Sequence, residues 1–162
     1  MKVAVTKLDA MMTEVLLRNG YDEADVPFIV SMYLGGELRG HTSHGLASFP
    51  GFAKQKIVSD KKPVILKDTH SLFMIDAMAQ SGNVLGRRAA DEAIKKAKNE
   101  GIGTSIIKNM ESWLRPGAVA EYVADQGFIA IVINNGGEAT VAPSGGFDPV
   151  TGTNPYCIWH TI

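Results

Sequence analysis

The run from Leu38 to Gly45 places a cation, a hydroxyl and two imidazoles between glycines, directly after a predicted helix. Imidazole can both donate and take up a proton near neutral pH, because its unperturbed pKa lies close to 7. Arg39 can hold a carboxylate through two parallel hydrogen bonds. These residue types at this spacing indicate a polar reaction centre with a proton donor and a cation that can orient an acid.

His41 and His44 are three residues apart, so they could share a helical face as a pair of metal ligands would. No carboxylate lies in the same segment, and a metal site needs three or four ligands, so we predict no metal here. Two alternatives stay open for these histidines: proton transfer by one of them, and a structural histidine at a helix N-terminus.

A loop rich in glycine and proline follows an apolar run that ends in Asn134-Asn135-Gly136-Gly137, and it extends to Gly152-Thr153-Asn154-Pro155. Such residues usually serve tight turns, but backbone amides at a strand end can also receive a cofactor. No Gly-x-Gly-x-x-Gly element and no phosphate-binding loop occurs, which argues against a doubly wound dinucleotide fold and a nucleotide triphosphatase. Arg115 could meet a substrate carboxylate or be a solvated loop residue.

The composition predicts a folded globular protein with one core or two small subdomains. The 162 residues are 45% hydrophobic and 20% charged, and the net charge of -1 gives no attraction for nucleic acid or anionic membranes. No run is long enough to span a membrane and no signal peptide is evident, so a cytoplasmic location is expected. The single cysteine, Cys157, excludes an internal disulfide, and its apolar surroundings predict burial.

Hydrophobic periodicity predicts three helices in the first part of the chain. The first covers 6–19 with Thr6 as its N-cap, and the second follows a cap at Asp22. Gly35-Gly36 in the second helix either frays its end or allows another backbone to approach closely. The third covers 46–57, with a kink or a late start at Pro50.

From about residue 61 the pattern changes to alternating strands and helices. We predict a hairpin of strands 64–67 and 71–75, strands 104–108 and 128–134, and helices 83–99 and 116–125. Arg87, Arg88, Lys95 and Lys96 are expected on the outer face of the longer helix. The predicted fold class is α/β, with a helical segment over 1–60 and an α/β unit over 61–162.

Five sequence blocks stand in order along nearly the whole chain: Arg39-Gly40-x-x-Ser43-His44-Gly45, Gly101-Ile102-Gly103, Asn109 with Gly117, Val141-Ala142-Pro143-x-Gly145-Gly146, and Gly152-Thr153-Asn154-Pro155. Together they resemble the malate/L-lactate dehydrogenase family of the non-Rossmann type. Its relatives include ureidoglycolate dehydrogenase, sulfolactate dehydrogenase, diketogulonate reductase and the cyclic ketimine reductases.

The resemblance implies an oxidoreductase that uses NAD or NADP and moves a hydride to or from C2 of a 2-oxo acid, a 2-hydroxy acid or a cyclic imino acid. It implies a cofactor domain that is not doubly wound, and a dimer or larger homo-oligomer. By this match His44 is the proton donor, Ser43 and Arg39 position the substrate, and Gly136 lies beside the cofactor. The chemistry agrees, because hydride delivery to a carbonyl creates an oxyanion that needs a proton.

The chain also departs from the family. Family members are about twice as long, so this chain resembles an N-terminal half, and a complementary C-terminal half is an expected partner. Ser112 replaces a histidine, and Ser48 replaces an arginine, that relatives commonly carry. These losses support an alternative, a catalytically silent homologue that acts as an interaction subunit. A hydrolase using Ser43 and His44 is disfavoured, because adjacent residues rarely align as nucleophile and base.

Overall fold

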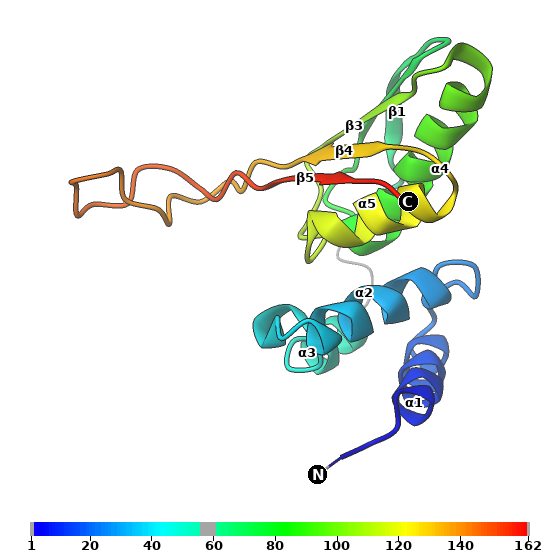
Figure 1. Cartoon of the computed structure of the whole chain (residues 1–162), viewed down its shortest axis with the longest axis vertical. Coiled ribbons are helices and arrows are strands. Elements are labelled where there is room, and N and C mark those ends of the chain that lie inside the picture. The colour runs from blue at the N-terminus through cyan, green and yellow to red at the C-terminus, as the bar shows by residue number, and fades with distance from the viewer. Residues whose placement is uncertain (1, 56–60, 162) are drawn as a thin grey trace.

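The computed structural model describes residues 2–55 and 61–161 and has a mixed α/β architecture, as the sequence predicts. Figure 1 shows the first helices below the sheets, and a long arm that extends to one side. In chain order the elements are α1 (Val5–Arg18), α2 (Val26–Leu38), the 3₁₀ turn η1 (Thr42–His44), α3 (Phe49–Lys54), β1 (Val64–Asp68), β2 (Leu72–Asp76), α4 (Gly82–Glu100), β3 (Thr104–Lys108), α5 (Pro116–Asp125), β4 (Ala130–Ile133) and β5 (Tyr156–Trp159).

Helix α2 carries apolar residues on two faces and packs between two groups of elements. Ile29 and Tyr33 join a core cluster with Leu16 of α1 and residues of α3. Phe28 and Met32, on another face, pack against α4, α5 and the segment between β3 and α5. Because side chains of α2 are buried in two core clusters, the position of its C-terminal end is fixed. The predicted active-site segment begins at that end.

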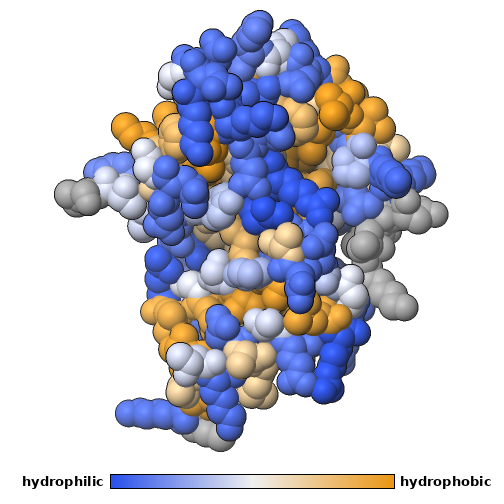
Figure 2. Space-filling view, turned by 90° about the vertical axis from the view of Figure 1, so that its right-hand side faces the viewer, coloured by the Kyte–Doolittle hydropathy of each residue, from blue (hydrophilic) through white to orange (hydrophobic). Residues whose placement is uncertain are grey.

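Sheet A contains β1, β2 and β3 in that order, with β1 antiparallel to β2 and β2 parallel to β3. The predicted hairpin is therefore confirmed. Helix α4 covers one face of this sheet, where the Ser105 hydroxyl donates to the Ala89 carbonyl oxygen at 2.6 Å. The surface on the side of α4 and α5 is mostly hydrophilic, with hydrophobic groups gathered at its margins (Figure 2).

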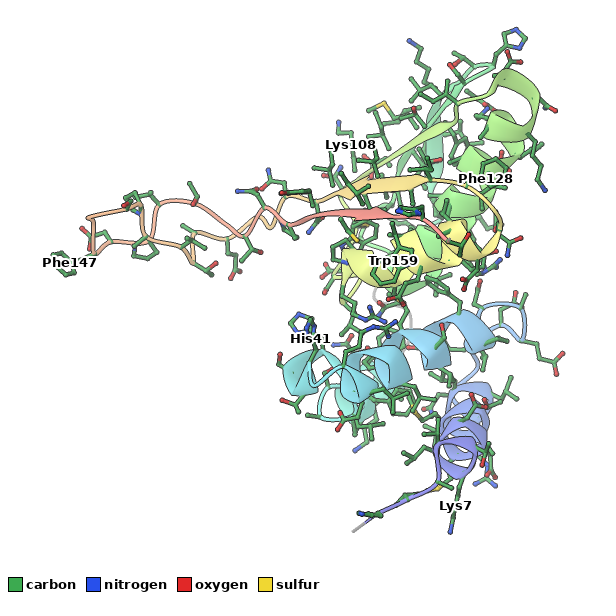
Figure 3. The ribbon with its side chains drawn as sticks, in the orientation of Figure 1. Lys7, His41, Lys108, Phe128, Phe147 and Trp159 are labelled. Atoms are coloured by element: carbon green, nitrogen blue, oxygen red, sulfur yellow. The ribbon has the colours of Figure 1, made fainter. Side chains whose placement is uncertain are left out.

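Sheet B pairs β4 with β5 antiparallel, and residues 134–155 between them form the extended arm of Figure 1. Helix α5 packs on one face of this sheet, where Ala130 is buried. The arm is held by its own backbone contacts, including a bridge between Val141 and Thr151 and a hydrogen bond from the Gly136 amide to the Thr153 carbonyl oxygen at 2.7 Å. Phe147 lies at its tip and is 98% exposed (Figure 3).

Several predicted boundaries are wrong. The first helix starts at Val5 without a side-chain cap, so Thr6 is not its N-cap. The second starts at Val26, because Asp22 closes a preceding turn by accepting the Ala24 amide at 2.9 Å. Proline delays the third helix to Phe49, and part of the predicted range 46–57 lies outside the described residues. The division near residue 61 stays a prediction.

Two charged side chains predicted on the outer face of the long helix are instead largely buried. Arg87 is 18% exposed and Lys96 is 11% exposed. Arg87 donates to the Asp25 carboxylate at 2.6 Å, and Arg88 donates to the other oxygen of Asp25 at 2.7 Å. Lys96 lies 2.5 Å from Asp68 of β1. These contacts attach α4 both to the start of α2 and to the edge of sheet A.

Residues other than glycine adopt the left-handed backbone conformation in the turns that follow β2 and β3. Met78 and Ala79 have φ angles of 52° and 64°, and Asn109, after β3, has 53°. The Asp76 carboxylate accepts the Met78 amide at 2.9 Å and the Asn109 side-chain amide at 2.8 Å. The hydrogen bond from Met78, followed by those of Asn109 and the charge of Lys108, outweighs desolvation and lowers the pKa of Asp76.

Replacing Asp76 with alanine is expected to lower the melting temperature at pH 7, because the strained turn loses the carboxylate that holds it. Since the folded pKa is lowered, this stabilisation is present above the unfolded value of about 4 and is lost as pH falls through the folded pKa. Thermal melts of Asp76→Ala and the parent protein should therefore converge in acid. Asp148→Ala, on the exposed arm, is the control and should match the parent throughout. A pH-independent difference would contradict this account.

Candidate active site

The segment from Arg39 to Gly45 folds as a short turn against the end of α2, and η1 places Ser43 and His44 next to each other. The Ser43 hydroxyl and His44 Nδ1 are 2.8 Å apart, and both residues are exposed. The backbone carbonyl of His44 lies so close to Gly36 that a Cβ there would collide with it. The prediction that Gly35-Gly36 allows a close backbone approach is confirmed, since the helix continues to Leu38.

The contact between Ser43 and His44 defines how the imidazole is presented. When the hydroxyl donates to Nδ1, the neutral ring carries its proton on Nε2 and directs it away from Ser43. We expected adjacent residues not to align in this way, and that expectation is wrong. A hydrolase is still disfavoured, because Ser43 lies in a 3₁₀ turn and not on the strained strand-to-helix turn of a nucleophile elbow.

Arg39 and Arg115 converge on one carboxylate. Arg39 lies 2.8 Å from Oε1 of Glu121, and Arg115 lies 3.4 Å from its Oε2. Both guanidinium groups lie against Gly35, and a Cβ there would require the ends of these side chains to shift. Arg115 also donates to the Met32 carbonyl oxygen at 3.3 Å and is only 11% exposed, so the interpretation as a solvated loop residue is wrong.

Contacts within the protein already occupy hydrogen-bond donors of Arg39 that a substrate carboxylate would use. Its guanidinium also donates to the Gly35 carbonyl oxygen at 3.0 Å, and its side chain remains 47% exposed. A substrate carboxylate would therefore have to share Arg39 with Glu121 or displace it. No local pattern in the sequence indicates this pairing, because Glu121 lies in α5, 82 residues from Arg39. The two glycines were the only hint that something packs closely there.

The two serines at departures from the family pattern are engaged in local turns. Ser48 donates to the Gly45 carbonyl oxygen at 3.0 Å, just before α3. The Ser112 hydroxyl accepts the Leu114 amide at 3.3 Å, and Leu114 has a φ of 67°. Neither hydroxyl supplies a cation or an imidazole at its position. The nearby Arg115 guanidinium is directed to the Met32 carbonyl oxygen and to Glu121.

Gly136, the residue expected beside the cofactor, lies at the base of the arm. A Cβ there would lie 2.8 Å from the Thr153 hydroxyl, and a Cβ at Gly152 would collide with the Gly136 carbonyl. These two glycines let the two runs of the arm approach each other. The structure therefore gives Gly136 a local packing role and does not bring it into contact with His44.

His44 lies outside the cavity between α2 and α5. A cavity of about 410 Å³ lies between α2 and α5 and is lined by Arg39, Ser31, Arg87 and Glu121 among others, but not by His44, Ser43 or Gly136. His41 projects into solvent on the helical part (Figure 3). Within residues 2–55 and 61–161, no group of three potential metal-ligating side chains forms.

Cys157 of β5 is only partly buried, so the predicted burial is only partly met. Burial, followed by the negative charge of Glu121, raises the pKa of this thiol, and Arg115 opposes them. The thiol is thus mostly protonated at neutral pH and is a poor nucleophile. Cys157 also reports on the ion cluster of Arg39, Arg115 and Glu121.

Glu121→Gln is expected to increase the alkylation rate of Cys157 at pH 7.5 by a few-fold, because removing the negative charge lets Arg115 stabilise the thiolate. The measurement is the pH dependence of iodoacetamide labelling, followed by mass spectrometry. The matched control is Glu138→Gln on the exposed arm, which should leave the rate unchanged. An unchanged rate in Glu121→Gln would mean that Glu121 does not act on Cys157.

Comparison with known proteins identifies the family. The malate/L-lactate dehydrogenase family profile matches residues 3–159. L-sulfolactate dehydrogenase of Methanocaldococcus jannaschii is 32% identical over 152 residues, covering 91% of this chain and 44% of that protein. 2,3-diketo-L-gulonate reductase of Escherichia coli is 30% identical over 162 residues, covering 98% of this chain and 48% of that protein. The chain therefore belongs to the malate/L-lactate dehydrogenase family.

Solved structures agree with this assignment. Malate dehydrogenase from Pyrococcus horikoshii matches 98% of this chain and 46% of its own, with a TM-score of 0.86 and 30% identity. The Methanocaldococcus jannaschii sulfolactate dehydrogenase matches with a TM-score of 0.84 and 31% identity, covering 98% of this chain and 47% of that one. The chain thus spans about half the length of these relatives. In the described residues, no helix is long and apolar enough to cross a membrane.

Proposed function

We propose that this chain is the N-terminal half of an oxidoreductase that uses NAD or NADP and interconverts a small 2-oxo acid or cyclic imino acid with its reduced form. The observation that carries the proposal is the exposed imidazole of His44, oriented through Nδ1 by Ser43, in a family whose named members are dehydrogenases and reductases. The nicotinamide cofactor supplies or accepts the hydride at C2. The remaining chemistry belongs to the protein.

His44 supplies the proton in this proposal. As the carbonyl carbon gains a hydride, its oxygen becomes negatively charged, and a donor within hydrogen-bond reach lowers that barrier. In the imidazolium form of His44, Nδ1 donates to the Ser43 hydroxyl oxygen, and Nε2 gives its proton to the new alkoxide; the neutral ring that remains takes the proton back at Nε2 in the oxidation direction. The proposed role of Ser43 is therefore to orient His44, in addition to or instead of positioning the substrate.

Arg39 is the proposed partner of the substrate carboxylate. It keeps about half of its side chain exposed while bound to Glu121, so a ligand can reach it. A bidentate carboxylate would compete with Glu121 for the same donors. Gly136 and the arm are proposed to lie beside the cofactor once the complementary half is present. A cytoplasmic homo-oligomer is the expected setting.

The second candidate is a catalytically silent subunit that acts through its surfaces. It is favoured by the engagement of Ser48 and Ser112 in local turns and of Arg39 with Glu121, which leaves His44 without a second proton-transfer group among the described residues. Such a subunit would retain the fold and lose turnover. The two candidates make opposite predictions for one assay.

The assay uses the chain alone and the chain joined after Ile162 to the C-terminal half of the Methanocaldococcus jannaschii relative. Each is titrated with NADH and NADPH by cofactor fluorescence, and turnover is then followed at 340 nm with 2-oxo acids and cyclic imines. Binding and turnover by the joined protein would support the enzyme. A folded joined protein that binds neither cofactor, or binds without turnover, would contradict the enzyme and favour the silent subunit.

A further inference from the structure

The face of sheet B opposite α5 is an exposed apolar surface. Alternate residues of β4 and its lead-in point to this face, and the strand register places two residues of β5 opposite them. We call these residues the sheet B face, and their exposed fractions are 74% for Ile129, 67% for Ile131, 74% for Ile133, 76% for Tyr156 and 58% for Ile158. None of them carries a charge.

The chain exposes more surface than a compact monomer of its mass is expected to expose. A monomer of 17.4 kDa is expected to expose about 7,900 Å². The chain exposes 10248 Å², so the excess is about 2,300 Å². A standard protein interface buries about 800 Å² on each partner. The excess is therefore large enough for an extensive, permanent interface, and the sheet B face and the arm are its most apolar and most extended parts.

Sheet B is small and is packed on one face only. Within the described residues it has two strands, and α5 supports one face while the sheet B face is left in water. Both outer strand edges leave backbone groups available for pairing. The arm adds no packing to this face, because it extends away from the sheet (Figure 1). Whatever covers the sheet B face must supply apolar side chains and, at an edge, backbone partners.

We infer that the sheet B face is the seam that receives the complementary half of the family fold, supplied in the same polypeptide or as a separate one. Relative length points to this occupant, because 98% of this chain superposes on a relative with a TM-score of 0.86, yet 54% of that relative lies outside the matched segment. That remainder must pack on the shared segment, and a second copy of this chain would not supply it. This inference rests on the proposed function only for the identity of the partner.

The test is assembly in trans, measured separately from activity. The tagged chain is co-expressed with the C-terminal half of the Methanocaldococcus jannaschii or Escherichia coli relative, and size-exclusion chromatography with light scattering measures the mass of the complex. Hydrogen exchange of 129–133 and 156–159 reports whether the sheet becomes protected. We expect a one-to-one complex with slowed exchange in both strands.

A matched pair of variants locates the seam. Ile131→Lys, at a residue 67% exposed on the sheet B face, should weaken the complex at least about 30-fold. Ile102→Lys, at a residue 66% exposed near the start of β3, should leave affinity unchanged. Both sites are exposed, so both variants should fold, which circular dichroism checks.

Several outcomes would overturn the inference. They are the absence of a complex with either half, equal weakening by both variants, and a homodimer of the chain alone that Ile131→Lys dissociates. The last result would assign the face to a second copy. A complex that assembles through this face without turnover would support the seam while contradicting the proposed oxidoreductase, so the two proposals fail separately.

Discussion

His44→Ala is expected to reduce turnover of the assembled enzyme by roughly 10² to 10⁴-fold, the range for loss of a positioned general acid. His44 is exposed and in contact with Ser43, so the substitution removes a ring without opening a cavity in the core. The substrate KM should change little, because the lost interaction strengthens only as negative charge develops on the oxygen.

The matched control is His41→Ala, an exposed histidine three residues away that should retain full activity. Ser43→Ala should lie between the two, since it loosens the ring without removing it. The measurement is kcat and KM for the joined protein, together with the pH profile of kcat. Full activity of His44→Ala, or equal losses in both histidine variants, would refute the assignment of His44 as proton donor.

Asp25→Ala is expected to lower the free energy of unfolding by about 3–5 kcal/mol, because it leaves two arginines without their shared carboxylate. Asp25 is 2% exposed, and its oxygens accept from Arg87 at 2.6 Å and Arg88 at 2.7 Å. Arg87 continues to Asp91 at 2.7 Å, and the Tyr122 hydroxyl donates to that residue at 2.5 Å. The network connects α2, α4 and α5.

Urea denaturation at pH 7 measures this effect, with circular dichroism as the readout. Asp22→Ala is the matched control, since Asp22 lies 3.9 Å from Arg88 and is 60% exposed, which limits its contribution to below about 1 kcal/mol. If Asp25→Ala is too unstable to purify, Arg88→Met tests the same contact with a partner that is half exposed. A loss below about 1 kcal/mol in Asp25→Ala would show that the network does not hold these helices together.

The ion cluster at Arg39 and the network at Asp25 have different consequences for function. The Asp25 network fixes where α2 lies against α4 and α5, and the end of α2 in turn carries η1. The cluster of Arg39, Arg115 and Glu121 includes the arginine that is proposed to bind the substrate carboxylate. A variant that frees Arg39 should thus alter substrate affinity, whereas one that disrupts Asp25 should alter stability.

Local sequence patterns determined most of the secondary structure. The predicted hairpin, the long helix and the strand at 104–108 appear where expected, because periodicity, glycine at helix ends and proline near helix starts act within a few residues. Gly101 ends α4 with a φ of 79°, as its sequence position indicates. Helix starts were less predictable. Thr6 makes no capping hydrogen bond, and Asp22 accepts an amide in the turn before α2 and does not cap the helix.

The sequence by itself also determined the family and the order of the polar residues around His44, because the blocks that carry them are short and contiguous. Only the tertiary structure decided what those residues face. Glu121 reaches Arg39 from a helix 82 residues along the chain, and Asp25 turns Arg87 inward from a predicted outer face. Pairings at such separation follow from how helices pack, which no local pattern encodes, so the partner of a charge is known only when the fold is.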